Sequence, residues 1–161
     1  MPNDSKLDNS EFKAEKVLQT AVININGKIE NVFPLFGAFE ERKWAEGWNP
    51  ELIYPSTEII EEGTTFKTDG YGTDESEFIW RVTKYQPEQF LIQYLVSTEN
   101  RYWTITIKCE PADDNKTSAE ITYSFIGLNE LGNSYNRDAL KRMYKNNLKD
   151  WEEEINRYLN T

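Results

Sequence analysis

Alternation of apolar and polar residues dominates the middle of the chain, between positions 52 and 128. In three runs, 78–82, 103–109 and 119–125, the large side chains occupy every second position. A period of two places these side chains on one face of a strand. Short turns separate six strand-like runs, and short connections favour antiparallel pairing. The pattern predicts an antiparallel sheet with one buried and one solvent-exposed face.

Before this region, the pattern predicts one more strand and two short helices. The run VLQTAVINI, at 17–25, has the β-branched composition of a strand. KIENVFPLF, at 28–36, has apolar residues at helical spacing, and Pro34 inside it predicts a short or kinked helix. AFEERKWAE, at 38–46, predicts a second short helix.

The last part of the chain is amphipathic. Apolar side chains step by three and four between 140 and 159, and charged side chains occupy the opposite side. The apolar positions are Leu140, Met143, Tyr144, Leu148, Trp151, Ile155, Tyr158 and Leu159. This spacing predicts one long helix that packs on the sheet.

Composition and charge exclude several classes of function. The net charge of −10 argues against nucleic acid and against an anionic membrane surface as partners. The chain has no histidine, which excludes Ser–His and Cys–His nucleophile pairs and disfavours a zinc site. Cys109 is the single cysteine, so no internal disulfide forms; we interpret it as a small buried hydrophobe. Without a signal-peptide-like or membrane-spanning apolar run, we expect a cytoplasmic protein.

The length fits one domain. We expect a disordered N-terminal tail over 1–16, which is polar, and a single domain over 17–161. Aromatic residues make up 14% of the chain although its mean hydropathy is −0.75. The apolar residues are therefore few but large.

The order of elements and several local runs resemble a known superfamily. The runs are NGKIENVFPLF, ERKWAEGWNPELIYP, EEGTTF, EFIWRVTKYQP and WEEEINRYL. From Val17 onward the chain resembles the START-like or Bet v 1-like superfamily, also called SRPBCC. It looks closest to the polyketide cyclase/dehydrase-type and uncharacterised bacterial members.

This resemblance implies an α+β helix-grip fold. A curved, seven-stranded antiparallel sheet would wrap on a long C-terminal helix, with two short helices after the first strand. The resemblance also implies a cavity between sheet and helix for a lipid-, polyketide- or steroid-like molecule. We expect no metal and no cofactor, and the oligomeric state stays open.

Three functions remain open. The first, which we favour, is binding of a small hydrophobic or aromatic molecule. The candidate ligand-binding residues are Trp44, Trp80, Trp103, Tyr123, Phe125, Tyr144 and Trp151. The alternative for each ring is that it only fills the core, as most buried aromatic side chains do.

The second function is a cyclase or dehydrase without histidine. Its candidate catalytic residues are Glu41, Arg42, Arg81 and Tyr123. The third is a chaperone-activator-like interaction module, which would need an exposed apolar patch instead of a deep pocket.

The segment FGAFEERKWAEGWNP, at 36–50, has two interpretations. If Trp44 points inward, Glu40 or Glu41 lies against apolar walls, where a raised pKa would suit a general base. The alternative is a solvated helix face with short-range ion pairs. We favour the solvated face for the charges, and an anchoring role for Trp44 and Trp48.

Overall fold

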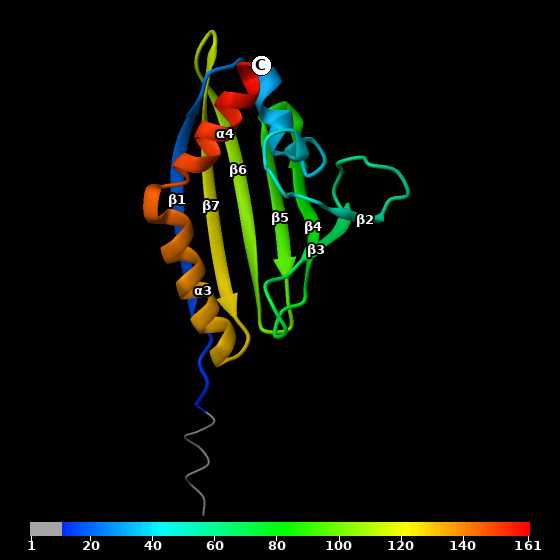
Figure 1. The fold of residues 1–161 in the computed structure, drawn as a ribbon, viewed down its shortest axis with the longest axis vertical. Coiled ribbons are helices and arrows are strands. Elements are labelled where there is room, and N and C mark those ends of the chain that lie inside the picture. Colours follow the sequence, from blue (N-terminus) through cyan, green and yellow to red (C-terminus); the bar gives the residue numbers. More distant parts are fainter. Residues whose placement is uncertain (1–10) are drawn as a thin grey trace, which may run out of the picture.

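The computed structural model describes residues 11–161, which form a seven-stranded antiparallel sheet with helices on one face (Figure 1). The strands are β1 Lys16–Ile25, β2 Glu51–Tyr54, β3 Thr65–Asp69, β4 Glu77–Gln86, β5 Leu91–Ser97, β6 Arg101–Asp113 and β7 Lys116–Gly127. Their order in the sheet is β1-β7-β6-β5-β4-β3-β2. The first and last strands are therefore neighbours, and the other strands follow the chain as a meander.

The helices are short before the sheet and longer after it. They are α2 Ile29–Val32, α3 Glu130–Met143, α4 Lys149–Leu159 and the 3-10 helices η1 Phe33–Phe36, η2 Glu40–Lys43, η3 Pro87–Gln89 and η4 Tyr144–Asn146. Pro34 stands at the start of η1, where its missing N–H is not needed. The predicted α+β helix-grip class, with two short helices after the first strand, is confirmed.

The C-terminal helix differs from the prediction in two respects. It begins at Glu130, well before the predicted stripe over 140–159, and it is made of two helices. Asn147 and Leu148 adopt left-handed backbone conformations, with φ of 55° and 60°, between η4 and α4. Both helices lie on the same face of the sheet, so the apolar pattern continues across the break. Leu148 is only 1% exposed, which shows that the break itself is packed into the core.

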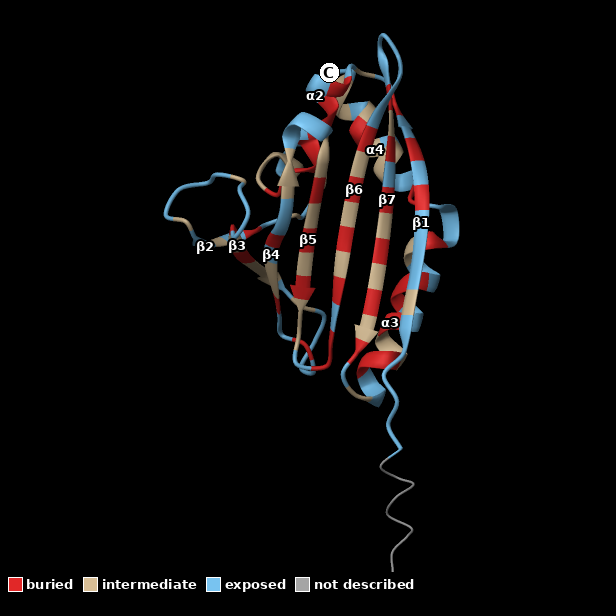
Figure 2. Cartoon of the chain, turned by 180° about the vertical axis from the view of Figure 1, so that it is seen from behind, coloured by how far each residue is buried: buried red, intermediate tan, exposed pale blue. Residues whose placement is uncertain are grey.

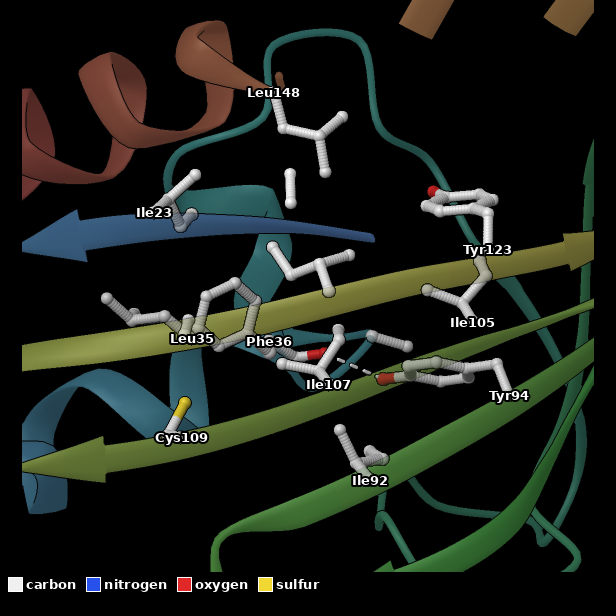
Figure 3. Packing of buried hydrophobic residues seen from close by; sticks show 14 of the residues in the cluster. Ile23, Leu35, Phe36, Ile92, Tyr94, Ile105, Ile107, Cys109, Tyr123 and Leu148 are labelled. Carbon is white, nitrogen blue, oxygen red and sulfur yellow. Dashed lines mark hydrogen bonds between the residues drawn. The ribbon is translucent and has the colours of Figure 1, made fainter. Parts of the chain in front are cut away.

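The helices cover the sheet unevenly. Helix α3 packs against β7, β1 and β6, and α4 packs against β1. The segment after β1 packs over the other strands at one end: the Tyr94 hydroxyl of β5 donates to the Phe36 carbonyl over 2.8 Å (Figure 3). The C-terminal helices and the segment after β1 leave a space between them over β4, β6 and β7.

The predicted alternation on β4, β6 and β7 is confirmed, and Figure 2 shows it as bands of buried residues along the strands. Side chains of the inner face form one core together with the helices. Cys109 is 1% exposed, and burial raises the pKa of its thiol to about 12. This agrees with a packing role.

Of the expected N-terminal tail, positions 1–10 lie outside the described residues. Strand β1 begins at Lys16. Within residues 11–161, no helix has the length and apolar character needed to cross a membrane.

Candidate ligand-binding site

A cavity of about 580 Å³ lies between the inner face of the sheet, the segment 45–49 and the C-terminal helices. We call it the aromatic cavity. Its rings are Trp48, Tyr71, Phe78, Trp80, Trp103, Tyr123, Phe125 and Trp151. The volume falls within the range of about 300–1,000 Å³ that is usual for small-molecule sites.

Strand register brings the sheet rings together. Trp103 of β6 is opposite Phe125 of β7, and their ring centroids are 5.3 Å apart. Phe78 of β4 packs edge-on against Trp103, also at 5.3 Å. Because the residues of one face alternate along each strand, these rings project into the same space. Trp151 of α4 faces Tyr123 from the helix side, at 6.4 Å.

Five of the seven predicted ligand-binding residues line the aromatic cavity: Trp80, Trp103, Tyr123, Phe125 and Trp151. Trp44 and Tyr144 stand behind this wall. The Trp44 indole N–H donates to the Leu35 carbonyl over 2.7 Å, and its ring packs 5.7 Å from Trp151. The Tyr144 hydroxyl donates to the Ile121 carbonyl over 3.3 Å. These two side chains support the rings that face the cavity.

Sequence reasoning missed three of the lining rings. Trp48 was interpreted as an anchor, and its indole N–H does donate to the Ala38 carbonyl over 2.7 Å. Its ring also lines the cavity and packs edge-on against Trp80 at 5.2 Å. Phe78 shares the inward parity of Trp80, so the alternation could have found it. Tyr71 lies in the β3–β4 turn, where no periodic signal exists.

A second cavity, of about 720 Å³, adjoins the first, and we call it the outer cavity. The turn 71–75 and the outward side of α3 line it. The two cavities share Tyr71, Arg101 and Arg142. These three residues therefore mark the junction between the aromatic cavity and a neighbouring cavity lined mainly by charged and polar side chains.

Arg101 is buried at this junction together with Glu75; their side chains are 4% and 3% exposed. The Arg101 Nε and Nη2 atoms donate to the Glu75 carboxylate, with distances of 2.9 and 2.7 Å to its two oxygens. Thr98 donates to the same carboxylate over 2.9 Å. The guanidinium carbon lies 4.7 Å from the ring centre of Trp103. Pairing and stacking together offset the cost of burying the charge.

Asn136 of α3 completes this polar cluster. Its Oδ1 accepts from Arg101 Nη1 over 3.3 Å, whereas its buried Nδ2 has no acceptor among the described residues. Arg101 was not among the predicted site residues. It precedes Trp103 by two positions, so the alternation of β6 already placed it on the inner face.

Glu41 departs from the favoured interpretation of a solvated helix face. The residue is partly exposed, yet burial of its carboxyl group raises the pKa of that group from 4.5 to about 8. Burial also raises the pKa values of Tyr94 and Tyr123 well above their usual range, and the Glu41 charge contributes in both cases. Glu40 behaves as expected for the solvated face, since it pairs with Lys43 at 2.6 Å.

The other two candidate catalytic residues lie away from both cavities. Arg42 is exposed and pairs with Glu58 at 2.5 Å. Arg81 is exposed on β4, and its nearest side-chain partner is the Ser97 hydroxyl at 3.5 Å. Residues 11–161 contain no group of three or more acidic, cysteine or histidine side chains arranged to hold a metal ion.

Comparison with solved structures places the chain in a fold class. A point mutant of norcoclaurine synthase from Thalictrum flavum, in complex with a transition-state analogue, aligns with a TM-score of 0.63 at 11% identity, covering 92% of this chain and 97% of that one. Ara h 8.0201 aligns with a TM-score of 0.60 at 14% identity, covering 89% and 98%. An uncharacterised protein from Rhizobium leguminosarum aligns with a TM-score of 0.60 at 17% identity, covering 88% and 97%.

The chain thus has the helix-grip fold of the Bet v 1-like, or SRPBCC, proteins, as the sequence resemblance implied. No family model matches the chain, and no curated protein matches it by sequence. At these identities the likeness concerns the fold alone, and function has to be argued from the site.

Proposed function

We propose that this protein binds a small, mainly apolar molecule with aromatic or fused rings, such as a polyketide-, steroid- or lipid-like compound, in the aromatic cavity. The observation that carries the proposal is the lining itself: four of the five tryptophans of the chain border one cavity. Tryptophan has a large apolar ring and a polar N–H group. Four indole rings around a space of this size can stack on the ring system of a ligand.

Two further observations support binding rather than simple packing. Trp80 and Trp151 line the cavity and are only partly buried, so part of each ring remains available to a ligand. Norcoclaurine synthase, which shares the fold, has been solved in complex with dopamine and hydroxybenzaldehyde, two small aromatic molecules. The aromatic cavity is a hollow between the sheet and the helices, which suits a small molecule, whereas an interaction module needs an exposed apolar patch.

The test is a titration of the purified protein with flavonoids, aromatic polyketides, steroids and fatty acids. A ligand in the aromatic cavity should change tryptophan emission, because four indoles border it. It should also stabilise the fold, by about 2.7 kcal/mol at a ligand concentration of 100 Kd. If no compound changes emission or melting, and native mass spectrometry finds no co-purified mass, the interaction-module alternative gains.

A variant that fills the cavity provides a control for location. Ala139 lies on α3, is 6% exposed and lines the cavity. Ala139→Phe should weaken binding, at an overpacking cost of about 1–3 kcal/mol. Leu131→Phe, at an exposed position of the same helix, adds aromatic surface outside the cavity and should leave binding unchanged. Equal affinity in both variants would place the ligand elsewhere.

A second candidate function is acid–base catalysis of the cyclase or dehydrase type. It is favoured by the Glu41 carboxyl group, whose pKa of about 8 keeps it protonated at neutral pH, near the cavity-lining Tyr123. A neutral carboxylic acid in apolar surroundings can donate its proton to a carbonyl or hydroxyl oxygen of a substrate. Incubation with hydroxylated polyketides, followed by mass spectrometry for the loss of water, tests this function; Glu41→Gln should abolish the loss without abolishing binding.

A further inference from the structure

Two arginines lie where the aromatic cavity meets the outer cavity. Arg101 begins β6 and Arg142 is close to the end of α3, and each lines both cavities. Any molecule that fills the aromatic cavity and extends toward the outer cavity passes these two guanidinium groups. The N–H groups of these arginines that have no acceptor therefore favour a ligand substituent that can accept hydrogen bonds.

Arg101 retains donors after forming its buried contacts. An arginine has five N–H groups. Its Nε–H and one N–H of Nη2 go to Glu75, and one N–H of Nη1 goes to Asn136. Among residues 11–161, the second N–H of each terminal nitrogen has no acceptor. Because Glu75 and the Trp103 ring hold the guanidinium in place, these two N–H groups are pre-organised.

Arg142 and Asn136 add to the excess of donors. Arg142 is exposed, lines both cavities and forms no ion pair with another residue of 11–161. The buried Nδ2 of Asn136 has no acceptor, and its orientation is set because Oδ1 accepts from Arg101. Turning the amide over would place two donors against each other. Asn136 itself lines neither cavity, so the donors that a ligand at the junction can reach are those of Arg101 and Arg142.

We propose that Arg101 and Arg142 bind an acidic group, a carboxylate or sulfonate, of a ligand whose aromatic body lies in the aromatic cavity. The inference rests on the proposed function and specifies its ligand class as an aromatic monoacid. Guanidinium groups suit such anions because two N–H groups can bind two oxygens in parallel.

Acidic neighbours limit the charge that the junction accepts. Glu75 neutralises Arg101, and Asp74 and Asp138 line the outer cavity. The chain as a whole carries −10. We therefore expect the junction to prefer a ligand with a single negative charge. Salt at about 0.15 M screens the repulsion from acidic groups beyond about 8 Å, so short-range hydrogen bonds to the arginines hold the ligand.

The experiment compares two dyes with the same aromatic body. Anilinonaphthalene sulfonate carries one negative charge, and N-phenylnaphthylamine lacks it. In fluorescence titrations the protein without any amino-acid substitution should bind the sulfonate dye more tightly than the neutral dye. Arg142→Gln should weaken sulfonate binding by about tenfold, the usual effect of losing one hydrogen bond to a charged group, and change neutral-dye binding less than twofold.

Lys141→Gln is the matched control, since it removes one positive charge from an exposed neighbour on α3 that lines neither cavity. It should leave both affinities unchanged. The paired variant Arg101→Gln with Glu75→Gln removes the buried charges together and should also weaken only the sulfonate, provided that it melts cooperatively.

Four outcomes would overturn the inference. One is equal binding of both dyes. Another is that Arg142→Gln leaves sulfonate binding unchanged, weakens the binding of both dyes equally, or has no larger effect than Lys141→Gln. A third is tighter binding of a cationic naphthylamine, which would indicate cation–π recognition by the rings. The fourth is binding of neither dye; titration with flavonoids, aromatic polyketides, steroids and fatty acids then decides separately whether the proposed function also fails. Neutral binding without charge preference leaves that function intact.

Discussion

Two ionisable side chains near the cavity, the buried Arg101 and the partly exposed Glu41, illustrate opposite solutions to the same physical problem. Arg101 keeps its charge because Glu75 lies 2.7 Å away and three aromatic rings surround the guanidinium. Glu41 forms no ion pair among the described residues, and burial shifts its pKa to about 8 instead. A charge in apolar surroundings is either paired or neutralised.

For the buried pair, we expect Glu75→Gln to lower the free energy of unfolding by about 3–5 kcal/mol, because it leaves the Arg101 charge uncompensated. The surface pair Arg42–Glu58 provides the control, as both side chains are at least 39% exposed. Glu58→Gln should cost about 1 kcal/mol or less. Urea unfolding of the two variants measures both values, and similar costs would contradict the assigned burial.

For Glu41, the raised pKa has a definite sign in stability. Folding favours the protonated carboxyl, so its contribution is complete below pH 4.5, declines as the pH rises toward about 8, and stays lost above that value. Glu41→Gln, which mimics the protonated form, should therefore raise stability at pH 8 by roughly 1–3 kcal/mol and have little effect at pH 4.

The control for this prediction is Glu40→Gln, since Glu40 lies on the same 3-10 turn and is exposed. Denaturant unfolding from pH 4 to pH 9 should show a pH-dependent gain only for Glu41→Gln. Parallel curves for the two variants would mean that the Glu41 carboxyl is hydrated.

At the scale of elements, the break between α3 and α4 shapes the cavity wall. Arg142 and Met143, at the end of α3, and Trp151, in α4, all line the aromatic cavity. Leu148 fills the core between them while its backbone is left-handed. Such a conformation costs a bulky residue roughly 1–2 kcal/mol, so burial of the side chain must exceed that cost.

The left-handed Asn147 allows a direct test of this break. Asn147→Gly should raise stability slightly, by up to about 1 kcal/mol, because glycine adopts a φ of 55° without hindrance. Asn146→Gly, one position earlier in the right-handed 3-10 turn, should instead cost about 0.5–1 kcal/mol. Thermal unfolding distinguishes the two, and a loss of stability in both variants would favour one continuous helix.

At the scale of the whole molecule, the C-terminal helices cover the inner face of the sheet over β1, β7 and β6, and they also hold the edge strand β1. Besides packing on β1, α4 donates and accepts through Asn156, whose amide contacts the backbone of Asn24 and Asn26. Glu152 accepts from the Asn24 N–H over 2.9 Å. These contacts satisfy part of the open edge of β1.

Deletion of residues 148–161 should therefore prevent folding. It removes Leu148 and Ile155, which are 1% and 0% exposed, together with Trp151. Each buried apolar side chain contributes about 2–5 kcal/mol by comparison with alanine, against a total stability of roughly 5–15 kcal/mol. Deletion of the exposed residues 160–161 alone is the control and should be harmless. A soluble truncated chain that melts cooperatively would contradict the conclusion that residues 148–161 are needed for folding.

The sequence by itself determined the order of strands and helices, the inward face of β4, β6 and β7, and the fold class. The strand faces and the elements follow from local periodicity, because a period of two or of about 3.6 already specifies which side chains face the same way. The helix-grip class was implied by the resemblance of the element order and local runs to a known superfamily. Arg101 shares the inward parity of Trp103, although it was not among the residues predicted for the site. Five of the seven rings predicted as ligand-binding accordingly line the cavity, although binding by them remains a prediction.

Only the tertiary structure decided which inward residues meet a cavity and which charges are buried. Trp44 and Trp48 lie in the same segment, yet only Trp48 reaches the aromatic cavity. Glu40 and Glu41 are adjacent, yet Glu40 pairs with Lys43 at the surface, whereas burial raises the pKa of the Glu41 carboxyl. Neither difference has a local signal, because solvent exposure and hydrogen-bond partners depend on segments far away in the chain. The break at Asn147 was invisible for the same reason, since both helices keep the apolar period while core packing around Leu148 sets the turn between them.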